Sequence, residues 1–184
     1  MKMFISERPI IQIAYAVKDV RKAAKYWSQK FNIGPFFINE HIKISNTLVN
    51  KKKSEFDHSS AYGWKENIMI ELICDHKIQD QPKNSNSIGI HHIAWIAPDF
   101  DKEKIILENE GCEEVLSANA GHRNGMKFAW FILETKLIIF MKYMKKVKKL
   151  VIFMIFYMNN LRIGTAKIRS EMFQILAEVF IYKI

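Results

Sequence analysis

The hydrophobic pattern of the chain contains one phrase twice. Residues 10–19 read IIQIAYAVKD and residues 90–99 read IHHIAWIAPD, so that Gln12 falls on His92 at a constant offset of 80 residues. Both phrases mix apolar, small and polar residues in the manner of a half-buried strand. Each ends at an Asp, a good helix cap, and apolar residues at helical spacing follow. The pattern therefore predicts a duplicated unit that begins with a strand and a helix.

Three further strands are expected after the helix of each unit. A charged loop over 51–60 interrupts the first unit, and a polar stretch over 75–87 is typical of a linker between the units. We therefore predict an α+β fold in which two βαβββ modules, over 8–76 and 88–145, pair around a central cleft. The expected further strands cover residues 36–44, 60–64, 67–74, 113–116, 126–131 and 137–143.

Several distinctive phrases lie between residue 10 and about residue 132: IQIAYAVKDV, FNIGPFF, GWKENIMIELI, GIHHIAWIAPDF and GMKFAWF. Together they resemble the vicinal oxygen chelate superfamily, which includes the glyoxalases, bleomycin-resistance proteins and dioxygenases. The FNIGPFF phrase after the first helix is similar to the branch that includes methylmalonyl-CoA epimerase. The resemblance implies metal ligands on the first and last strand of each module, all facing one cleft.

Three polar residues at matching places are the candidate metal ligands. Strand alternation puts Gln12 on one face with Ala14, and His92 on the matching face with Ala94. Glu71 lies within IMIELI, where a carboxylate is costly to bury without a cation or a donor. Oxygen and nitrogen donors of these types hold divalent cations. We predict a divalent metal site at Gln12, Glu71 and His92, with Glu71 also as the catalytic carboxylate.

Other interpretations of these residues remain open. His92 could be a hydrogen-bonded core histidine, Glu71 could pair with a Lys, and Gln12 could hydrogen-bond a substrate. Strict alternation makes His91 face away from His92, in a structural role. The remaining histidines lie in expected loops or strand ends: His41, His58, His76 and His122.

The expected eighth strand departs from the family pattern. The family usually ends there in LGHxxExxE, whereas this chain reads KLIIFMKYMKK and has no Glu. Read from the third base of each codon, a Met-Lys pair always gives Glu, and Met141-Lys142 and Met144-Lys145 are two such pairs. We therefore hypothesise that the reading frame is shifted here and that residues 146–184 are an atypical tail that results from it. The alternative is a genuine extension whose Lys run contacts a membrane surface or an acidic partner.

The charge and composition restrict the partners. The net charge is +9, from 28 basic and 19 acidic residues. From Leu137 onward there are 9 basic and 2 acidic residues, so residues 1–136 carry 28 − 9 = 19 and 19 − 2 = 17. That part is nearly neutral, which argues against nucleic acid as a partner. No stretch reaches the ~20 apolar residues of a membrane span, and two cysteines make no disulfide framework. We expect a cytoplasmic protein that forms a homodimer.

These features lead to one main functional prediction and one alternative. The resemblance implies a metal-dependent glyoxalase-type or epimerase-type scaffold, a lyase or isomerase, in the domain 1–145. Such an enzyme moves a proton next to a carbonyl, and its substrate would be a small carbonyl compound or a CoA-thioester-like molecule. We expect activity to be impaired because the eighth-strand Glu is missing. The alternative is a non-catalytic protein of the same fold that binds or sequesters a small molecule.

Overall fold

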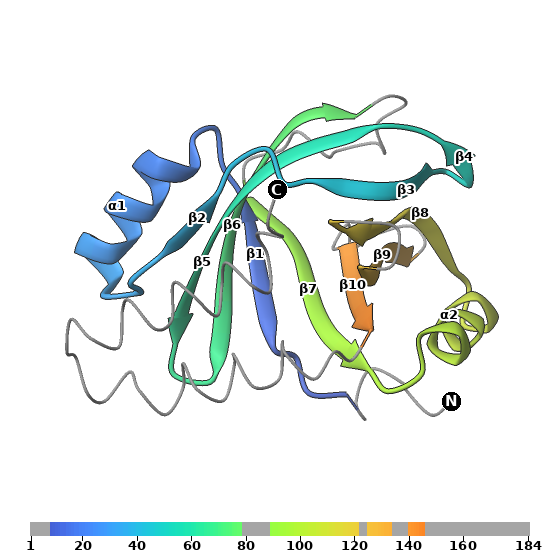
Figure 1. Ribbon diagram of the computed structural model, residues 1–184. Coiled ribbons are helices and arrows are strands. Elements are labelled where there is room, and N and C mark those ends of the chain that lie inside the picture. Colours follow the sequence, from blue (N-terminus) through green and yellow to red (C-terminus); the bar gives the residue numbers. More distant parts are fainter. Residues whose placement is uncertain (1–7, 79–88, 122–124, 134–139, 146–184) are drawn as a thin grey trace. The chain divides into compact units, whose positions relative to one another are not determined.

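The computed structural model describes residues 8–78, 89–121, 125–133 and 140–145. All of them belong to the compact unit Met1–Lys145, and the predicted tail lies outside the described residues. Figure 1 shows two short helices beside a long sheet. The elements are β1 (Gln12–Ala16), α1 (Val20–Phe31), β2 (Phe37–Asn39), β3 (Ile44–Val49), β4 (Lys52–Lys53), β5 (Phe56–Lys65), β6 (Ile68–Ile78), β7 (Gly89–Ala97), α2 (Phe100–Asn109), β8 (Cys112–Ala120), β9 (Met126–Leu133) and β10 (Phe140–Lys145).

The sheet is built from two equivalent halves. Its strand order is β2-β5-β6-β1-β7-β10-β9-β8-β3-β4. In the first half β1 pairs parallel with β6, and β6 and β5 pair antiparallel; in the second half β7, β10 and β9 repeat these relations. The predicted α+β fold of two βαβββ modules is confirmed.

The two halves meet where β1 pairs antiparallel with β7. Ile13 lies opposite Ile93, while Gln12 lies opposite Ala94 and Ala14 lies opposite His92. The Gln12–Ala94 pair becomes the Ala14–His92 pair when each residue is exchanged for its equivalent at an offset of 80, and Ile13–Ile93 becomes itself. A local twofold axis therefore passes through the Ile13–Ile93 pair. The sheet therefore has the predicted equivalence of Gln12 and His92.

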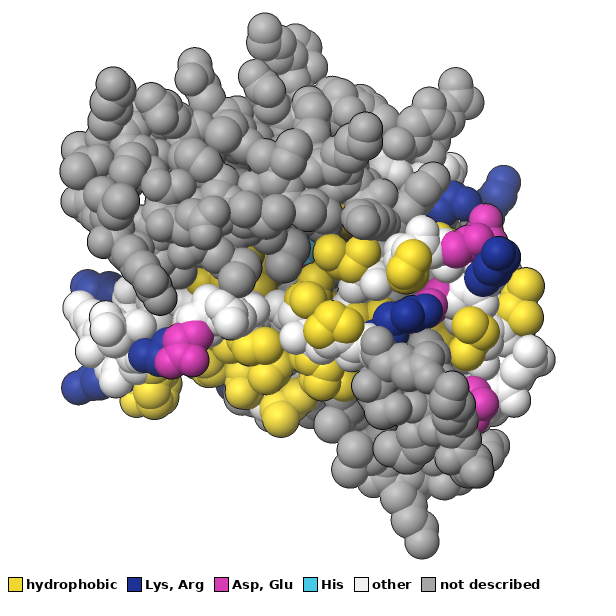
Figure 2. Space-filling model, turned by 90° about the horizontal axis from the view of Figure 1, so that it is seen from below, with side chains coloured by type: hydrophobic (Ala, Val, Ile, Leu, Met, Phe, Trp, Pro, Cys, Tyr) yellow, Lys and Arg dark blue, Asp and Glu magenta, His cyan; other side chains and the backbone are white. Residues whose placement is uncertain are grey.

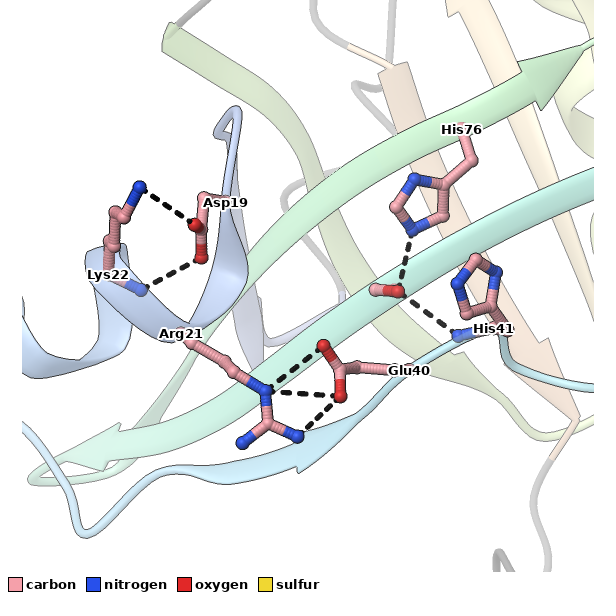
Figure 3. A network of polar contacts seen from close by, with 7 residues as sticks. Asp19, Arg21, Lys22, Glu40, His41 and His76 are labelled. Atoms are coloured by element: carbon pink, nitrogen blue, oxygen red, sulfur yellow. Dashed lines mark hydrogen bonds and ion pairs between the residues drawn. The ribbon is translucent and has the colours of Figure 1, made fainter.

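Both helices begin at the predicted aspartates. The backbone N–H of Lys22 donates to Asp19 Oδ1 at 3.0 Å, and that of Lys102 donates to Asp99 Oδ1 at 3.2 Å. Figure 3 shows the first of these caps at the start of α1. The carboxylate satisfies a backbone donor that has no partner within the helix. For Asp19, this backbone hydrogen bond lowers the side-chain pKa from its ordinary value.

An ion pair joins α1 to the chain that follows β2. The Arg21 guanidinium donates to both carboxylate oxygens of Glu40, as Figure 3 shows. The hydrogen bond from Arg21 lowers the pKa of the Glu40 carboxyl. Both side chains are exposed, so the pair contributes little to stability.

The first module contains a hairpin that the sequence did not predict. The segment 36–44 was expected to be one strand, but it holds the short strand β2 and the first residue of β3. Strand β3 pairs with β4 and, across the sheet, with β8 of the second module. The hairpin turns at Asn50 and Lys51, which both have positive φ angles. Strands β3 and β4 therefore extend the second half of the sheet.

Two expected irregular segments are also partly strand. The predicted charged loop, 51–60, contains β4 and the start of β5, and the predicted linker, 75–87, contains the end of β6. Strands β5 and β6 pair with each other along most of their length, from Phe56 opposite Ile78 to Lys65 opposite Ile68. The backbone hydrogen bonds of this pairing hold polar residues in an extended conformation, although their local propensity favours a loop.

A buried carboxylate fixes α2 to the second module. The Trp95 indole N–H on β7 donates to Glu103 Oε1 at 2.7 Å, and Arg8 donates to both Glu103 oxygens at 3.3 Å. Glu103 is 2% exposed, so these donors replace the water that it loses. Leu107, on the same helix, packs in one apolar cluster with Trp95 and Phe131.

The described surface also carries large apolar side chains. Seen from below, apolar side chains gather between charged ones (Figure 2). No helix among the described residues is long and apolar enough to cross a membrane. The expected homodimer stays a prediction. The exposed large apolar residues are Ile10, Tyr26, Phe31, Ile38, Ile90, Ile105 and Ile106.

We predict that Glu103→Ala lowers the free energy of unfolding by about 2–3 kcal/mol, because buried Trp95 N–H then loses this acceptor. The matched control is Glu108→Ala on the same helix, where the carboxylate is 4.0 Å from Lys51 and exposed; its cost should stay within about 0.5 kcal/mol. Urea unfolding followed by tryptophan fluorescence measures both. Equal costs for the two variants would contradict the anchoring role of Glu103.

Candidate metal centre

The three predicted ligands come together at the seam between the modules. His92 Nε2 lies 3.3 Å from Gln12 Oε1 and 3.2 Å from Glu71 Oε2. Gln12 is 1% exposed, and Glu71 and His92 are 0% exposed. Ala14 lies between Glu71 on β6 and His92 on β7, and pairs with both. The sheet register thus brings a carboxylate, an imidazole and an amide into contact within the core.

The distances from His92 Nε2 to the other two donor atoms suit one cation. Donors held 2.1–2.2 Å from an ion at tetrahedral or octahedral angles lie about 3.0–3.6 Å apart. The two distances from His92 Nε2, 3.2 Å and 3.3 Å, fall in this interval. Among the described residues no three His, Cys, Asp or Glu side chains gather as a metal-binding group, so the set depends on the Gln12 amide oxygen. The donor chemistry fits a divalent ion.

The Glu71 carboxylate also has neutral hydrogen-bonding neighbours. The Ser60 hydroxyl on β5 donates to Glu71 Oε1 at 2.7 Å. Tyr62 lies directly opposite Glu71 in the β5–β6 ladder. Burial, and then the negative charge of Glu71, raise the pKa of the Tyr62 hydroxyl well above its ordinary value. A protonated Tyr62 and Ser60 therefore face one side of the carboxylate, while Oε2 faces His92.

Strict alternation predicted that His91 faces away from His92, and this prediction is wrong. Ala14 pairs with His92 and the next residue, Tyr15, pairs with Ile90, so the register shifts at His91 in a β-bulge. A bulge changes the direction of the side chains at that point. His91 Nδ1 lies 2.9 Å from His92 Nδ1, and His91 Nε2 lies 3.3 Å from Asp75 Oδ2 on β6.

Asp75 was not among the predicted site residues, because it was expected to lie in a linker. It extends β6 and pairs with His58 on β5. Its side chain is 4% exposed. The available signal was the spacing of Glu71, Ile73 and Asp75, which share one face if the strand continues past Cys74. Asp75 therefore stands at the same side of the sheet as Glu71.

The sheet register also identifies the position that corresponds to Glu71 in the second module. Glu71 on β6 pairs with Ala14, and Lys142 on β10 pairs with Ala94, which is the equivalent of Ala14. For β10 the structure describes only the backbone. The sequence left Met141 and Lys142 as alternatives for this place, and the register selects Lys142.

The other described histidines lie apart from the three ligands. His41 and His76 stack with their ring centroids 4.6 Å apart. Figure 3 shows the His76 ring and the His41 backbone N–H meeting one hydroxyl, that of Ser59. His58 is buried in β5 and stacks on Phe56 at 4.4 Å. His58 and His76 lie near strand ends, His58 at the start of β5 and His76 towards the end of β6, and His122 lies outside the described residues.

A hollow of about 640 Å³ lies at another place on the molecule. None of the three ligands lines it. Its lining residues are Asn50, Lys51, Glu108, Cys112, Glu113 and Glu114.

Comparison with known families supports the architecture. The profile of the Glyoxalase/Bleomycin resistance protein/Dioxygenase superfamily matches residues 11–130, which is 120 of 184 residues. This match confirms the family that the sequence phrases predicted. The comparison with curated protein sequences gives no match.

Solved structures with a similar fold have low sequence identity to this chain. A hypothetical protein from Bacillus halodurans C-125 is 13% identical with a TM-score of 0.50, over 77% of this chain and 96% of that one. A methylmalonyl-CoA epimerase from Mycobacterium tuberculosis is 12% identical with a TM-score of 0.46, over 78% of this chain and 91% of that one. The first likeness supports the fold alone.

The raised pKa of Tyr62 predicts a loss of stability at high pH. An unfolded Tyr ionises near pH 10 and the folded Tyr62 does not, so stability is complete below about pH 10 and falls as pH rises further. The control is Tyr26→Phe, which removes a hydroxyl from an exposed residue and keeps Tyr62. When the pH rises from 10 to 11, the free energy of unfolding of Tyr62→Phe should fall by about 1 kcal/mol less than that of the control. Urea unfolding at both pH values is the measurement. Equal losses in the two variants would contradict the burial of this hydroxyl.

Proposed function

Because the chain belongs to the Glyoxalase/Bleomycin resistance protein/Dioxygenase superfamily, we propose that Gln12, Glu71 and His92 hold a divalent metal ion in a glyoxalase-type or epimerase-type scaffold. The reaction class is proton transfer next to a carbonyl. One observation carries the proposal: His92 Nε2 faces two acceptor oxygens at 3.2 Å and 3.3 Å in a site closed to solvent. These three atoms could share one cation.

The three side chains would each contribute one donor atom. Gln12 is oriented with its oxygen towards His92, because its amide N–H donates to Met69 Sδ at 3.2 Å. Glu71 Oε2 and His92 Nε2 complete the set. A bound divalent ion supplies Lewis-acid stabilisation of negative charge that develops on a substrate oxygen.

Glu71 is the group that would accept a proton. Its Oε1 is occupied by the Ser60 hydroxyl, and its Oε2 faces the centre of the site. A buried carboxylate is poorly solvated and takes up a proton more readily than one in water. When Oε2 is not engaged as a metal ligand, Glu71 would therefore take a proton from the carbon next to the substrate carbonyl and return it.

The surroundings of the site favour a small, partly apolar substrate. Ala14 and Ala94, beside the donors, are fully buried and belong to one apolar cluster with Phe56, Phe128 and Trp130. Small side chains next to polar donors suit contact with a carbon skeleton. A small carbonyl compound or a CoA-thioester-like molecule fits the reaction class.

A second candidate function follows from Lys142. Lys142 lies at the position of the second module that corresponds to Glu71. A carboxylate at this position would complete the group of ligands formed by Gln12, Glu71 and His92, whereas a Lys is cationic at neutral pH. Like charges about 4 Å apart cost about 4 kcal/mol at an intermediate dielectric. This residue favours a non-catalytic protein of the same fold that binds a small molecule.

We predict that His92→Ala lowers the affinity for Zn²⁺ or Co²⁺ at least tenfold, since one of three donors is removed. His41→Ala, which removes an exposed histidine outside the site, is the matched control and should bind as the wild type does. Isothermal titration calorimetry of the full chain measures all three proteins. Equal affinity in wild type and His92→Ala removes His92 from the site.

We predict that Lys142→Glu raises the affinity for the same ions at least tenfold, because a repelling charge becomes a donor. Lys145→Glu makes the same change of charge three residues further along β10, opposite Ala97, and should have a much smaller effect.

The same two variants separate the enzyme from the binding protein. Hydrogen exchange next to the carbonyl of a CoA thioester in D₂O, followed by NMR, reports proton transfer directly. Exchange catalysed by Lys142→Glu and not by Lys145→Glu supports the enzyme. Tight metal binding without exchange in either variant favours the binding protein.

A further inference from the structure

A line of buried polar groups continues behind His92, away from the other two ligands. His92 Nδ1 contacts His91 Nδ1 at 2.9 Å, and His91 Nε2 contacts Asp75 Oδ2 at 3.3 Å. His91 is 4% exposed and the Asp75 side chain is also 4% exposed. Each imidazole thus has one ring nitrogen on the side of Gln12 and Glu71 and the other on the side of Asp75.

The position of His91 is set by the fold. The β-bulge opposite Ala14 and Tyr15 brings His91 to the side of His92. The His91 ring packs against Trp130 on β9 in an edge-on contact with 4.9 Å between ring centroids. Bulges cost regular pairing and commonly re-aim a side chain beside a functional site.

The order of donors along the line follows from the carboxylate at its end. An ionised Asp75 can only accept, so His91 donates from Nε2. A neutral His91 then has a lone pair on Nδ1 and accepts from His92 Nδ1. His92 therefore keeps its proton on Nδ1, and its Nε2 keeps the lone pair that a metal ion shared with Gln12 and Glu71 would take.

On the basis of the proposed metal site, we propose that His91 and Asp75 are positioning residues that fix the tautomer and ring orientation of His92. Neither touches the metal ion or the substrate. Their role is to hold a proton on His92 Nδ1 so that Nε2 is free to coordinate. Groups that orient a metal-binding histidine in this way typically change metal affinity by about 10- to 100-fold.

The test replaces the acceptor at the end of the line. Asp75→Leu keeps a similar volume but removes the acceptor, and should lower Zn²⁺ affinity about 10- to 100-fold. Asp75→Asn retains an amide oxygen that can accept from His91, and should restore the affinity to within a few-fold of wild type. His91→Phe keeps the ring against Trp130 without either nitrogen, and should resemble Asp75→Leu. Calorimetry with Zn²⁺ on the full chain measures the affinities.

A second readout reports the tautomer without metal. In protein labelled with ¹⁵N-histidine, His92 Nδ1 should carry a proton in wild type and in Asp75→Asn, and should lose this preference in Asp75→Leu. Asp57→Leu is the matched control, because Asp57 also binds a histidine ring, at His41 Nδ1, but outside this line. It should leave both readouts unchanged. Thermal unfolding of each variant checks that the fold is retained.

The outcomes separate this inference from the proposed function. Wild-type affinity and an unchanged His92 tautomer in Asp75→Leu overturn the positioning role, whatever the site binds. Loss of affinity in Asp57→Leu as well also overturns it, because the effect is then not specific to the line. Absence of Zn²⁺ binding in wild type overturns the proposed metal site, and the tautomer readout then decides the positioning role alone.

Discussion

The antiparallel pairing of β1 with β7 is the constraint on which the rest of the structure depends. Centred on Ile13 and Ile93, it joins two modules that are each incomplete sheets, and it sets Gln12 beside His92. The parallel partners β6 and β10 then bring Glu71 and Lys142 to equivalent places. A slip of one residue in this pairing would turn His92 to the face opposite Gln12 and Glu71. The seam therefore determines the fold and the site together.

The symmetry of the backbone is not matched by the symmetry of charge. One pair of equivalent positions holds Gln12 and His92, and the other holds Glu71 and Lys142, an acidic and a basic residue. A fully buried carboxylate needs a positive partner or several donors. Ser60 supplies one donor to Glu71, and the remaining oxygen faces the nitrogen of His92. The contacts within the site thus centre on the buried carboxylate of Glu71.

Sequence periodicity was sufficient for the elements of the repeat and insufficient for what lies between them. The strands at Gln12 and His92 and the helices capped by Asp19 and Asp99 were predictable because their signals are local. The β3–β4 hairpin was not, because its pairing with β8 is between residues far apart in the chain. The same reason applies to His91: alternation assumes a regular ladder, and the bulge exists only in the contact of β7 with β1.

The assignment of Lys142 bears on the hypothesis of a shifted reading frame. The family resemblance alone left Met141 and Lys142 as alternatives, and the register of β10 against β7 selects Lys142 on geometry. A codon made from the third base of codon 141 and the first two of codon 142 reads GAA, and one restored base upstream places this Glu at position 142. The same restored base also gives a Glu at position 145, from Met144-Lys145, and the first of these two falls at the position that the sheet register selects. On this hypothesis the Lys at position 142 is a consequence of the frame. On the alternative, in which the chain is read as intended, a basic residue at this position suits a protein that binds its ligand without transferring a proton.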